Sequence, residues 1–317
     1  MRGYFPNRRN LSLVILEGGA HMAPVNHGYR KEDEMKEFLH DKVVSTLSEN
    51  LQNLVINLFG VVDPNGVVTS EDGVDFSKPD FILSYKGQKR YVSMKSGGAE
   101  IVHTEQAKNF IPFLRSIGVS EDTLRTILLY QYGDGTVNGT GKQRMNNHQT
   151  FEWLSKRVEK ANDELNKVEI IMKVCDRALF QGVTGDVPAA DAIYHGDFKE
   201  GFVASRFQIE TYLENKSFDW IENLHVGPLL IRPHARYAGT EIKNPWARHK
   251  VVLYWPKMKY DIKYISGHYN DYIPEKYLDI EGECEDCTEE MLKKPKKRLN
   301  INKIPKKGLF SWLRNSR

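Results

Sequence analysis

An aspartate and a lysine, placed at either end of two short apolar runs, are the residues best suited to chemistry. Asp80 opens the run Phe81–Tyr85, and Lys95 closes the run 90–95. Residues 86–89 have the composition of a turn, so the two runs are predicted to form a β-hairpin. An aspartate can hold Mg²⁺, and a nearby lysine can position an attacking water or stabilise charge that develops on a phosphate. The pair therefore indicates metal-dependent hydrolysis of a phosphodiester.

The second run of the hairpin alternates between polar and apolar residues. Successive side chains of a strand point to opposite faces, so Tyr91, Ser93 and Lys95 share one face. Val92 and Met94 share the other face, and we expect this apolar pair to pack into a core. Lys95 is then left facing a cleft, where a substrate could meet it.

Further elements must position this hairpin, and the hydrophobic spacing predicts a mixed α/β core. A strand that returns to the sheet through a helix implies a parallel, right-handed crossover. In chain order, the elements expected around the hairpin are a helix over Glu32–Leu51, a strand over Leu54–Val62, a helix over Thr104–Ser116 and a strand over Thr126–Tyr132.

Pro79-Asp80 on the second expected strand and Ser93-x-Lys95 on the third resemble the motif of the PD-(D/E)xK nuclease superfamily, the fold of type II restriction endonucleases. The order helix, three strands, helix, strand is also that of the family. The resemblance covers residues 30 to 132, under a third of the chain. It implies a restriction-endonuclease-like core, a mixed sheet flanked by helices, with a C-terminal β-rich recognition region.

The same resemblance implies further site residues, a cofactor and a partner. The family commonly carries a glutamate on its first helix, for which Glu37 or Glu34 is available, and some branches carry a glutamine on the second, where Gln106 lies. Mg²⁺ is the implied cofactor and double-stranded DNA the implied partner. A homodimer is expected, because cutting both strands of a symmetric site favours two-fold symmetry.

The chain departs from the family motif at Ser93, which stands where an acid normally precedes the lysine by two residues. A serine cannot replace the charge of a carboxylate at a metal. In a minority of restriction enzymes of this fold, a glutamate of the following helix supplies the missing carboxylate. Glu105 is the predicted substitute and the second metal ligand beside Asp80, with Glu100 as the reserve.

Downstream of the core, the pattern predicts a glycine-rich loop over Gly133–Gly141, a helix over Phe151–Val168 and a strand over Glu169–Cys175. Phe202–Asn215 is ambiguous between strand and helix, and Val226–Tyr264 is mostly β in character. Basic and amide side chains here suit contacts with phosphates and base edges, although an ordinary polar surface has the same composition. The candidates for DNA contact are Arg144, Asn147, His148, Arg232, Arg236, Arg248 and Lys250.

Composition places loose bounds on the chain of 317 residues, of which 40% are hydrophobic and 27% charged. No apolar run is long enough to span a membrane, and three cysteines favour a reducing, cytoplasmic compartment. The net charge of +3 is unevenly distributed. The tail after position 292 has ten Lys or Arg and no acid, and the rest of the chain is net acidic. The predicted division is a leader or tag-like segment (1–22), a catalytic core (23–132), the remainder of the core with recognition and dimerisation (133–278), and an acidic-then-basic tail (279–317).

The hypothesis from these patterns is a magnesium-dependent DNA endonuclease, most simply a sequence-specific type II restriction enzyme. A defence or repair nuclease of the same fold, without a palindromic site, stays open as an alternative. So does a non-catalytic DNA-binding protein on a degenerate nuclease core, which Ser93 in place of an acid would favour.

Overall fold

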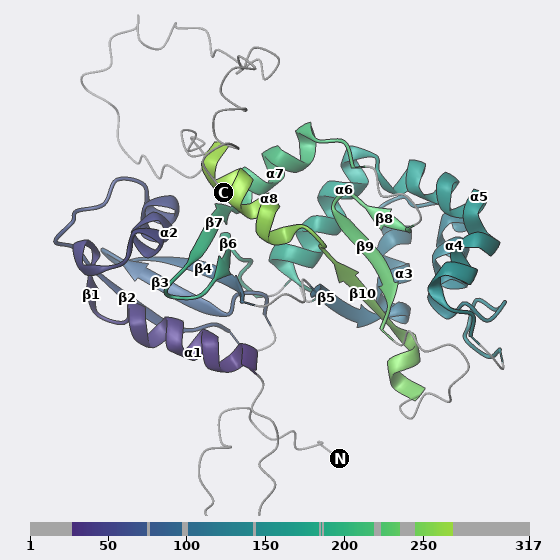
Figure 1. Ribbon diagram of the computed structural model, residues 1–317, viewed down its shortest axis with the longest axis horizontal. Helices are drawn as coiled ribbons and strands as arrows, with labels where there is room; N and C mark the ends of the chain where they lie inside the picture. Colours follow the sequence, from purple (N-terminus) through teal and green to yellow (C-terminus); the bar gives the residue numbers. More distant parts are fainter. Residues whose placement is uncertain are drawn as a thin grey trace, which may run out of the picture. The chain divides into compact units, whose positions relative to one another are not determined.

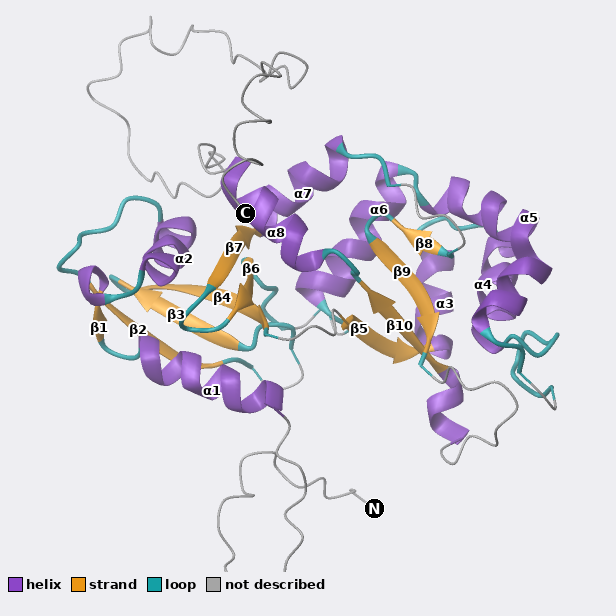
Figure 2. Cartoon of the chain, viewed as in Figure 1, coloured by secondary structure: helices purple, strands orange, loops and turns teal. Residues whose placement is uncertain are grey.

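Two β-sheets, each packed against helices, form the fold of the computed structural model (Figures 1 and 2). The structure describes residues 27–74, 77–96, 101–141, 144–183, 185, 187–218, 223–234 and 245–268. The helices are α1 (His27–Leu39), α2 (Glu49–Phe59), α3 (Ala107–Ser116), α4 (Glu121–Tyr132), α5 (Asn147–Leu165), α6 (Val168–Cys175), α7 (Arg206–Asn215) and α8 (Met258–His268). Short helical turns are η1 (Val44–Thr46), η2 (Asp176–Gln181) and η3 (Pro245–His249).

The six-stranded sheet has the order β1-β2-β3-β4-β6-β7, and the four-stranded sheet has the order β5-β10-β9-β8. Their strands are β1 (Lys42–Val43), β2 (Val67–Asp72), β3 (Phe81–Tyr85), β4 (Gln88–Lys95), β5 (Ile101–Gln106), β6 (Ala192–Gly196), β7 (Gly201–Ser205), β8 (His225–Val226), β9 (Leu229–Pro233) and β10 (Lys250–Tyr254). Strands β2, β3 and β4 form an antiparallel meander, and β4 pairs with β6 in parallel. The predicted fold class, a mixed sheet flanked by helices, is confirmed.

The predicted hairpin is confirmed as β3 and β4, with Phe81 opposite Val92. Lys86 and Gly87 form its two-residue turn, and both have positive φ angles, of 47° and 80°. Such angles match the twist of the flanking strands, and glycine adopts them without a steric penalty. The turn therefore fixes the register that aligns the two strands.

The expected single helix over 32–51 and the expected strand over 54–62 are both wrong. α1 ends at Leu39, and a second helix, α2, starts after Ser48 and ends before Gly60. Its buried residues are Leu51, Leu54, Val55 and Leu58, which lie on one face at helical spacing. The strand that precedes the hairpin is instead β2, in the stretch after the turn.

The expected strand over Thr126–Tyr132 is also wrong, because this segment belongs to α4. Local signals define the helix: the side chain of Ser120 accepts a hydrogen bond from the backbone of Thr123, and Gly133 ends it in the left-handed region. A short apolar run fits a buried helix as well as a buried strand, so its composition alone does not decide. The parallel strand that returns to the sheet is β6, about sixty residues later.

In the rest of the chain, the predicted helix over 151–168 is confirmed as α5, and the predicted glycine-rich loop 133–141 contains no helix or strand. The predicted strand over 169–175 is wrong, since these residues form α6 with its buried side chains on one face. The ambiguous segment 202–215 holds both element types, β7 and then α7. The expectation that residues 226–264 are mostly β is met only in part: the described residues of this range hold strands β9 and β10 and the end of β8, but also the helical turn η3 and most of α8.

Two hydrophobic clusters hold these layers together. Val92 and Met94 pack on α1 and α2 in the smaller cluster, so the predicted alternation along β4 is confirmed. The larger cluster includes Ile193 of β6 and is built mainly from the four-stranded sheet and the helices from α3 onward. Ser93 and Lys95 lie on the face opposite Val92 and Met94. Among the described residues, none of the helices is long and apolar enough to cross a membrane.

Candidate active site

Asp80 lies at the entrance of β3, directly beside β4. Its backbone N–H donates to the carbonyl of Val92 at 2.8 Å, which continues the ladder of the hairpin. Three donors of β4 reach its Oδ2 atom: Ser93 Oγ at 3.2 Å, the Met94 backbone N–H at 2.6 Å and Lys95 Nζ at 3.4 Å. The Oδ1 atom receives no hydrogen bond from the described residues. One carboxylate oxygen is thus fixed by the hairpin, and the other is left for a ligand.

Lys95 completes this arrangement from the end of β4. Besides its bond to Asp80, its Nζ atom donates to Ser93 Oγ at 3.0 Å and to the Met94 carbonyl at 2.9 Å. The side chains of Lys95 and Asp80 remain 25% and 23% exposed. The two residues predicted to carry the chemistry are therefore brought together where a substrate can reach them.

Glu32 of α1 is a further carboxylate at this cluster, and sequence reasoning missed it. Burial, followed by the negative charge of Asp80, raises its pKa from 4.5 to about 7, while Lys95 acts in the opposite direction. The start of α1 is attached to the end of β4, because Lys31 Nζ donates to the carbonyl of Ser96 at 3.2 Å. Two carboxylates and an ammonium thus share one electrostatic environment.

Helical spacing was the signal that could have found Glu32. It precedes the fully buried Met35 by three residues and Leu39 by seven, so it belongs to the stripe of α1 that faces the sheet. Glu34 and Glu37, which we predicted for this role, lie off that stripe.

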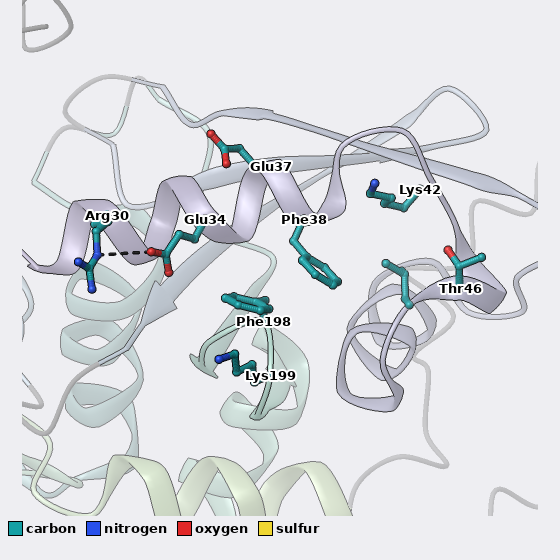
Figure 3. A pocket seen from close by; sticks show the side chains of 9 residues that line it. Arg30, Glu34, Glu37, Phe38, Lys42, Thr46, Phe198 and Lys199 are labelled. Atoms are coloured by element: carbon teal, nitrogen blue, oxygen red, sulfur yellow. Dashed lines mark ion pairs between the residues drawn. The ribbon is translucent and has the colours of Figure 1, made fainter. Parts of the chain in front are cut away.

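Glu34 and Glu37 instead line a pocket of about 730 Å³ with Phe38 of α1 (Figure 3). Phe38 stacks on Phe198 with ring centroids 5.0 Å apart, and Glu34 pairs with Arg30 at 3.4 Å. The acidic residue of α1 that is coupled to Asp80 is therefore Glu32, and the predicted glutamates belong to another part of the surface.

Glu105, predicted on a helix as a metal ligand, is on strand β5 because α3 begins only at Ala107. Arg177 donates to both of its oxygens, at 3.0 and 2.8 Å, and His103 Nε2 lies 3.1 Å from Oε1. Burial alone would raise the pKa of Glu105, but the bonds from His103 and Arg177 hold it below its ordinary value. Both oxygens of this carboxylate are paired with Arg177, so the position of Glu105 does not support its predicted role as a metal ligand. The reserve candidate, Glu100, lies outside the described residues.

Lys78 connects the Asp80 cluster with the Glu105 ion pair. Its Nζ atom donates to the Val102 carbonyl at 2.8 Å. Burial and then the charge of Lys95 lower its pKa from 10.5 to about 7, against the attraction of Asp80 and Glu105. An amine with such a pKa can hold or release a proton at neutral pH.

Gln106 directly precedes α3, without a side-chain capping hydrogen bond, and is not part of the Asp80 cluster. It lines a separate cavity of about 570 Å³ together with Tyr132 and His249, whose Oη and Nδ1 atoms lie 2.9 Å apart. Its Nε2 atom is buried and has no hydrogen-bond partner in the part of the chain that the structure describes. The prediction that Gln106 lies around the metal is therefore not supported by its position.

Two of the arginines predicted to contact DNA make hydrogen bonds within the protein. Arg144 is 7% exposed and donates from Nη1 to the Met145 carbonyl and to Asn147 Oδ1. Arg248 donates from Nη2 to Asp134 Oδ2 at 2.7 Å and to a carbonyl of the loop, so it anchors the glycine-rich segment. The hydrogen bonds of Arg248 thus hold both ends of the glycine-rich loop, whereas those of Arg144 reach only its near neighbours in the sequence.

The other candidates for DNA contact are more varied. His148 is exposed at the start of α5 and pairs with Glu152 at 3.3 Å. The guanidinium of Arg232 lies 4.8 Å from the ring centroid of Tyr254, and Lys250 begins β10. Arg236 lies outside the described residues.

Comparisons with known proteins add one weak likeness. No protein-family model matches the chain, and no curated protein matches its sequence. Among solved structures, it is similar to the crystal structure of the restriction endonuclease MspI in complex with its cognate DNA. The identity is 11%, the TM-score is 0.35, and the match covers 70% of this chain and 82% of that one.

The residues around Asp80 fit a magnesium ion that takes only one or two of its ligands from the protein. No group of three or more His, Cys, Asp or Glu side chains converges on a metal site within the described ranges. Mg²⁺, however, commonly uses only one or two carboxylates, with waters and substrate phosphate as its other ligands. Asp80 and Glu32 supply that number, and burial, followed by the negative charge of Asp80, raises the pKa of Glu32, so a bound cation would favour its charged form. Ser93 needs no acidic substitute from Glu105 in this arrangement.

Proposed function

We propose that this chain is a magnesium-dependent DNA endonuclease of restriction type that hydrolyses phosphodiester bonds, acting as a homodimer on double-stranded DNA. The observation that carries the proposal is the Asp80–Ser93–Lys95 hydrogen-bond cluster on the β3–β4 hairpin, with the carboxylate of Glu32 coupled to it. This set combines carboxylate oxygens for a metal with an ammonium for a phosphate.

Each residue of the cluster has a distinct task. Asp80 and Glu32 would hold Mg²⁺, which when bound lowers the pKa of a water and neutralises charge on the phosphate. The Ser93 hydroxyl and the Met94 N–H keep the Asp80 carboxylate in one orientation. The Lys95 ammonium donates hydrogen bonds to the charge that develops on the phosphate.

Cleavage of plasmid DNA with Mg²⁺ tests the proposal. Asp80→Ala and Lys95→Ala should each lower the cleavage rate by about 10²-fold or more. The matched control is Lys89→Ala, on the same hairpin, because this exposed lysine pairs with Glu71 of β2 away from the cluster. Equal cutting by the wild type and both cluster variants would refute the assignment.

The products of the same assay separate restriction from the related alternatives. Discrete fragments from plasmid DNA support sequence-specific cutting, whereas smears or decay from ends support a defence or repair nuclease. Retardation of DNA without metal-dependent cutting would indicate a non-catalytic binding protein.

A further inference from the structure

His195 of β6 is a buried imidazole that no other described residue contacts through a hydrogen bond. The residue is 6% exposed, and among the described residues neither Nδ1 nor Nε2 has a hydrogen-bond partner outside the backbone of His195 itself. A buried polar group that lacks a partner is costly, and native proteins contain few of them. We therefore expect His195 to have a hydrogen-bond partner in a functional state of the protein, such as one with a bound ligand.

The register of the sheet places His195 next to Lys95. The two residues are aligned on the parallel strands β4 and β6, and Ser93 is aligned with Ile193. Aligned residues of neighbouring strands share a face, so Asp80, Ser93, Lys95 and His195 form a polar row across three strands. His195 continues the candidate active site on the side of Lys95 that is remote from Asp80.

The groups that face His195 are cations. Burial, then the charges of Lys259 on α8 and Lys95 on β4, lower its pKa below the ordinary value. On the β7 side His195 is aligned with Phe202, and the Nζ atom of Lys263 lies 5.1 Å from the centroid of that ring. A neutral imidazole offers one acceptor nitrogen, and an ammonium offers only donors. The chemistry around His195 thus favours its use as an acceptor.

Lys95 already uses three acceptors, Asp80 Oδ2, Ser93 Oγ and the Met94 carbonyl. The bond to Asp80 is the longest of the three, at 3.4 Å. A divalent cation bound by Asp80 would repel the ammonium and take over the neutralisation of that carboxylate. One donor of Lys95 then needs a new acceptor.

We propose that His195 is this acceptor: a positioning residue that receives a hydrogen bond from Lys95 when a metal occupies Asp80 and so directs the lysine toward the phosphate. The inference rests on the proposed function. It assigns a role to β6 that the motif on β3 and β4 does not contain.

Nuclear magnetic resonance of the full chain, labelled with ¹⁵N in its histidine rings, tests the contact without measuring cleavage. The His195 signals, identified by their loss in His195→Asn, should shift when Mg²⁺ is added to the wild type. Lys95→Met should abolish that shift because the donor is missing, and Asp80→Asn should abolish it because the metal is not held. The exposed His148 serves as an internal control and should not respond.

Cleavage kinetics provide the second measurement. His195→Phe keeps a ring of similar size but no acceptor, and we expect kcat to fall about tenfold to a hundredfold with KM little changed. His195→Asn retains an acceptor and should recover part of this loss. Unfolding curves will show whether each variant is folded.

The outcomes distinguish two failures. If Asp80 and Lys95 are required for cutting, but the His195 signals ignore Mg²⁺ and His195→Phe cuts like the wild type, the inference on His195 is wrong and the nuclease assignment stands. If the wild type neither binds Mg²⁺ at Asp80 nor cuts DNA, both proposals are overturned together.

Discussion

Replacing Glu32 by glutamine should stabilise the metal-free protein at neutral and alkaline pH. Burial and the charge of Asp80 raise the pKa of the Glu32 carboxyl from 4.5 to about 7 in the folded chain. The folded state therefore binds a proton more tightly than the unfolded state does. Between these two pH values, the free energy of unfolding of the wild type falls as the pH rises. Glutamine has almost the same shape as glutamate but no titratable proton. The free energy of unfolding of Glu32→Gln should therefore not show this fall with rising pH.

The size of the effect follows from the pKa difference. A change from 4.5 to about 7 corresponds to about 3.4 kcal/mol, at roughly 1.36 kcal/mol for each pH unit. Glu32 is only partly buried, and solvent screening reduces this value to about 1–3 kcal/mol. Below pH 4.5 both side chains are neutral and the two proteins should be about equally stable. Above pH 7 the full difference should be present.

Urea unfolding from pH 4.5 to 8.5 in the presence of a chelator measures this difference. Glu37→Gln is the matched control, since Glu37 is on the exposed side of the same helix. Added Mg²⁺ should stabilise the wild type by mass action and should stabilise Glu32→Gln much less. A gap between the two proteins that is constant with pH, or an equal response to Mg²⁺, would refute the coupling between Glu32 and Asp80.

Three further substitutions test other contacts. Glu105→Gln should destabilise the fold by about 3 kcal/mol in urea unfolding at pH 7, because it leaves the Arg177 guanidinium without a carboxylate. Since the pKa of Glu105 is lowered in the folded protein, this loss should shrink as the pH falls below about 4.5. A loss independent of pH would contradict the ion pair as its cause. Arg144→Met should change the free energy of unfolding by less than about 1 kcal/mol, because Nε and Nη2 of this buried arginine have no hydrogen-bond partner among the described residues. A larger loss in a thermal unfolding scan would contradict this reasoning. Gly87→Ala should cost about 1 kcal/mol through its positive φ of 80°, with metal-dependent cleavage unchanged.

The sequence was most informative where structure is local. The hairpin from β3 to β4 was predicted because its turn and its alternating side chains lie within fifteen residues, and the structure then joins Asp80 to Lys95 directly. The N-cap and C-cap of α4 are equally local, and weighing Ser120 and Gly133 would have corrected the expected strand there.

Long-range features could not be predicted from spacing alone. Glu105 was assigned to the metal because it was expected on the helix that follows Lys95, yet it lies on a strand and its partner is Arg177, seventy-two residues away. Helical spacing could have placed Glu32 on the buried stripe of α1, but its coupling to Asp80 depends on how α1 packs on the sheet. The role proposed for His195 depends on a strand pairing that no local pattern in β6 reveals.

That parallel pairing has a consequence for how the protein folds. β4 and β6 align Val92 with Ala192, so the chain must close a loop of about one hundred residues to form the central ladder. Loop closure of this length carries an entropic cost, and contacts between distant residues slow folding. During synthesis, the hairpin with Asp80 and Lys95 leaves the ribosome long before the strand that will flank it. The polar row of the active site is therefore assembled late, only after β5 to α6 have been made.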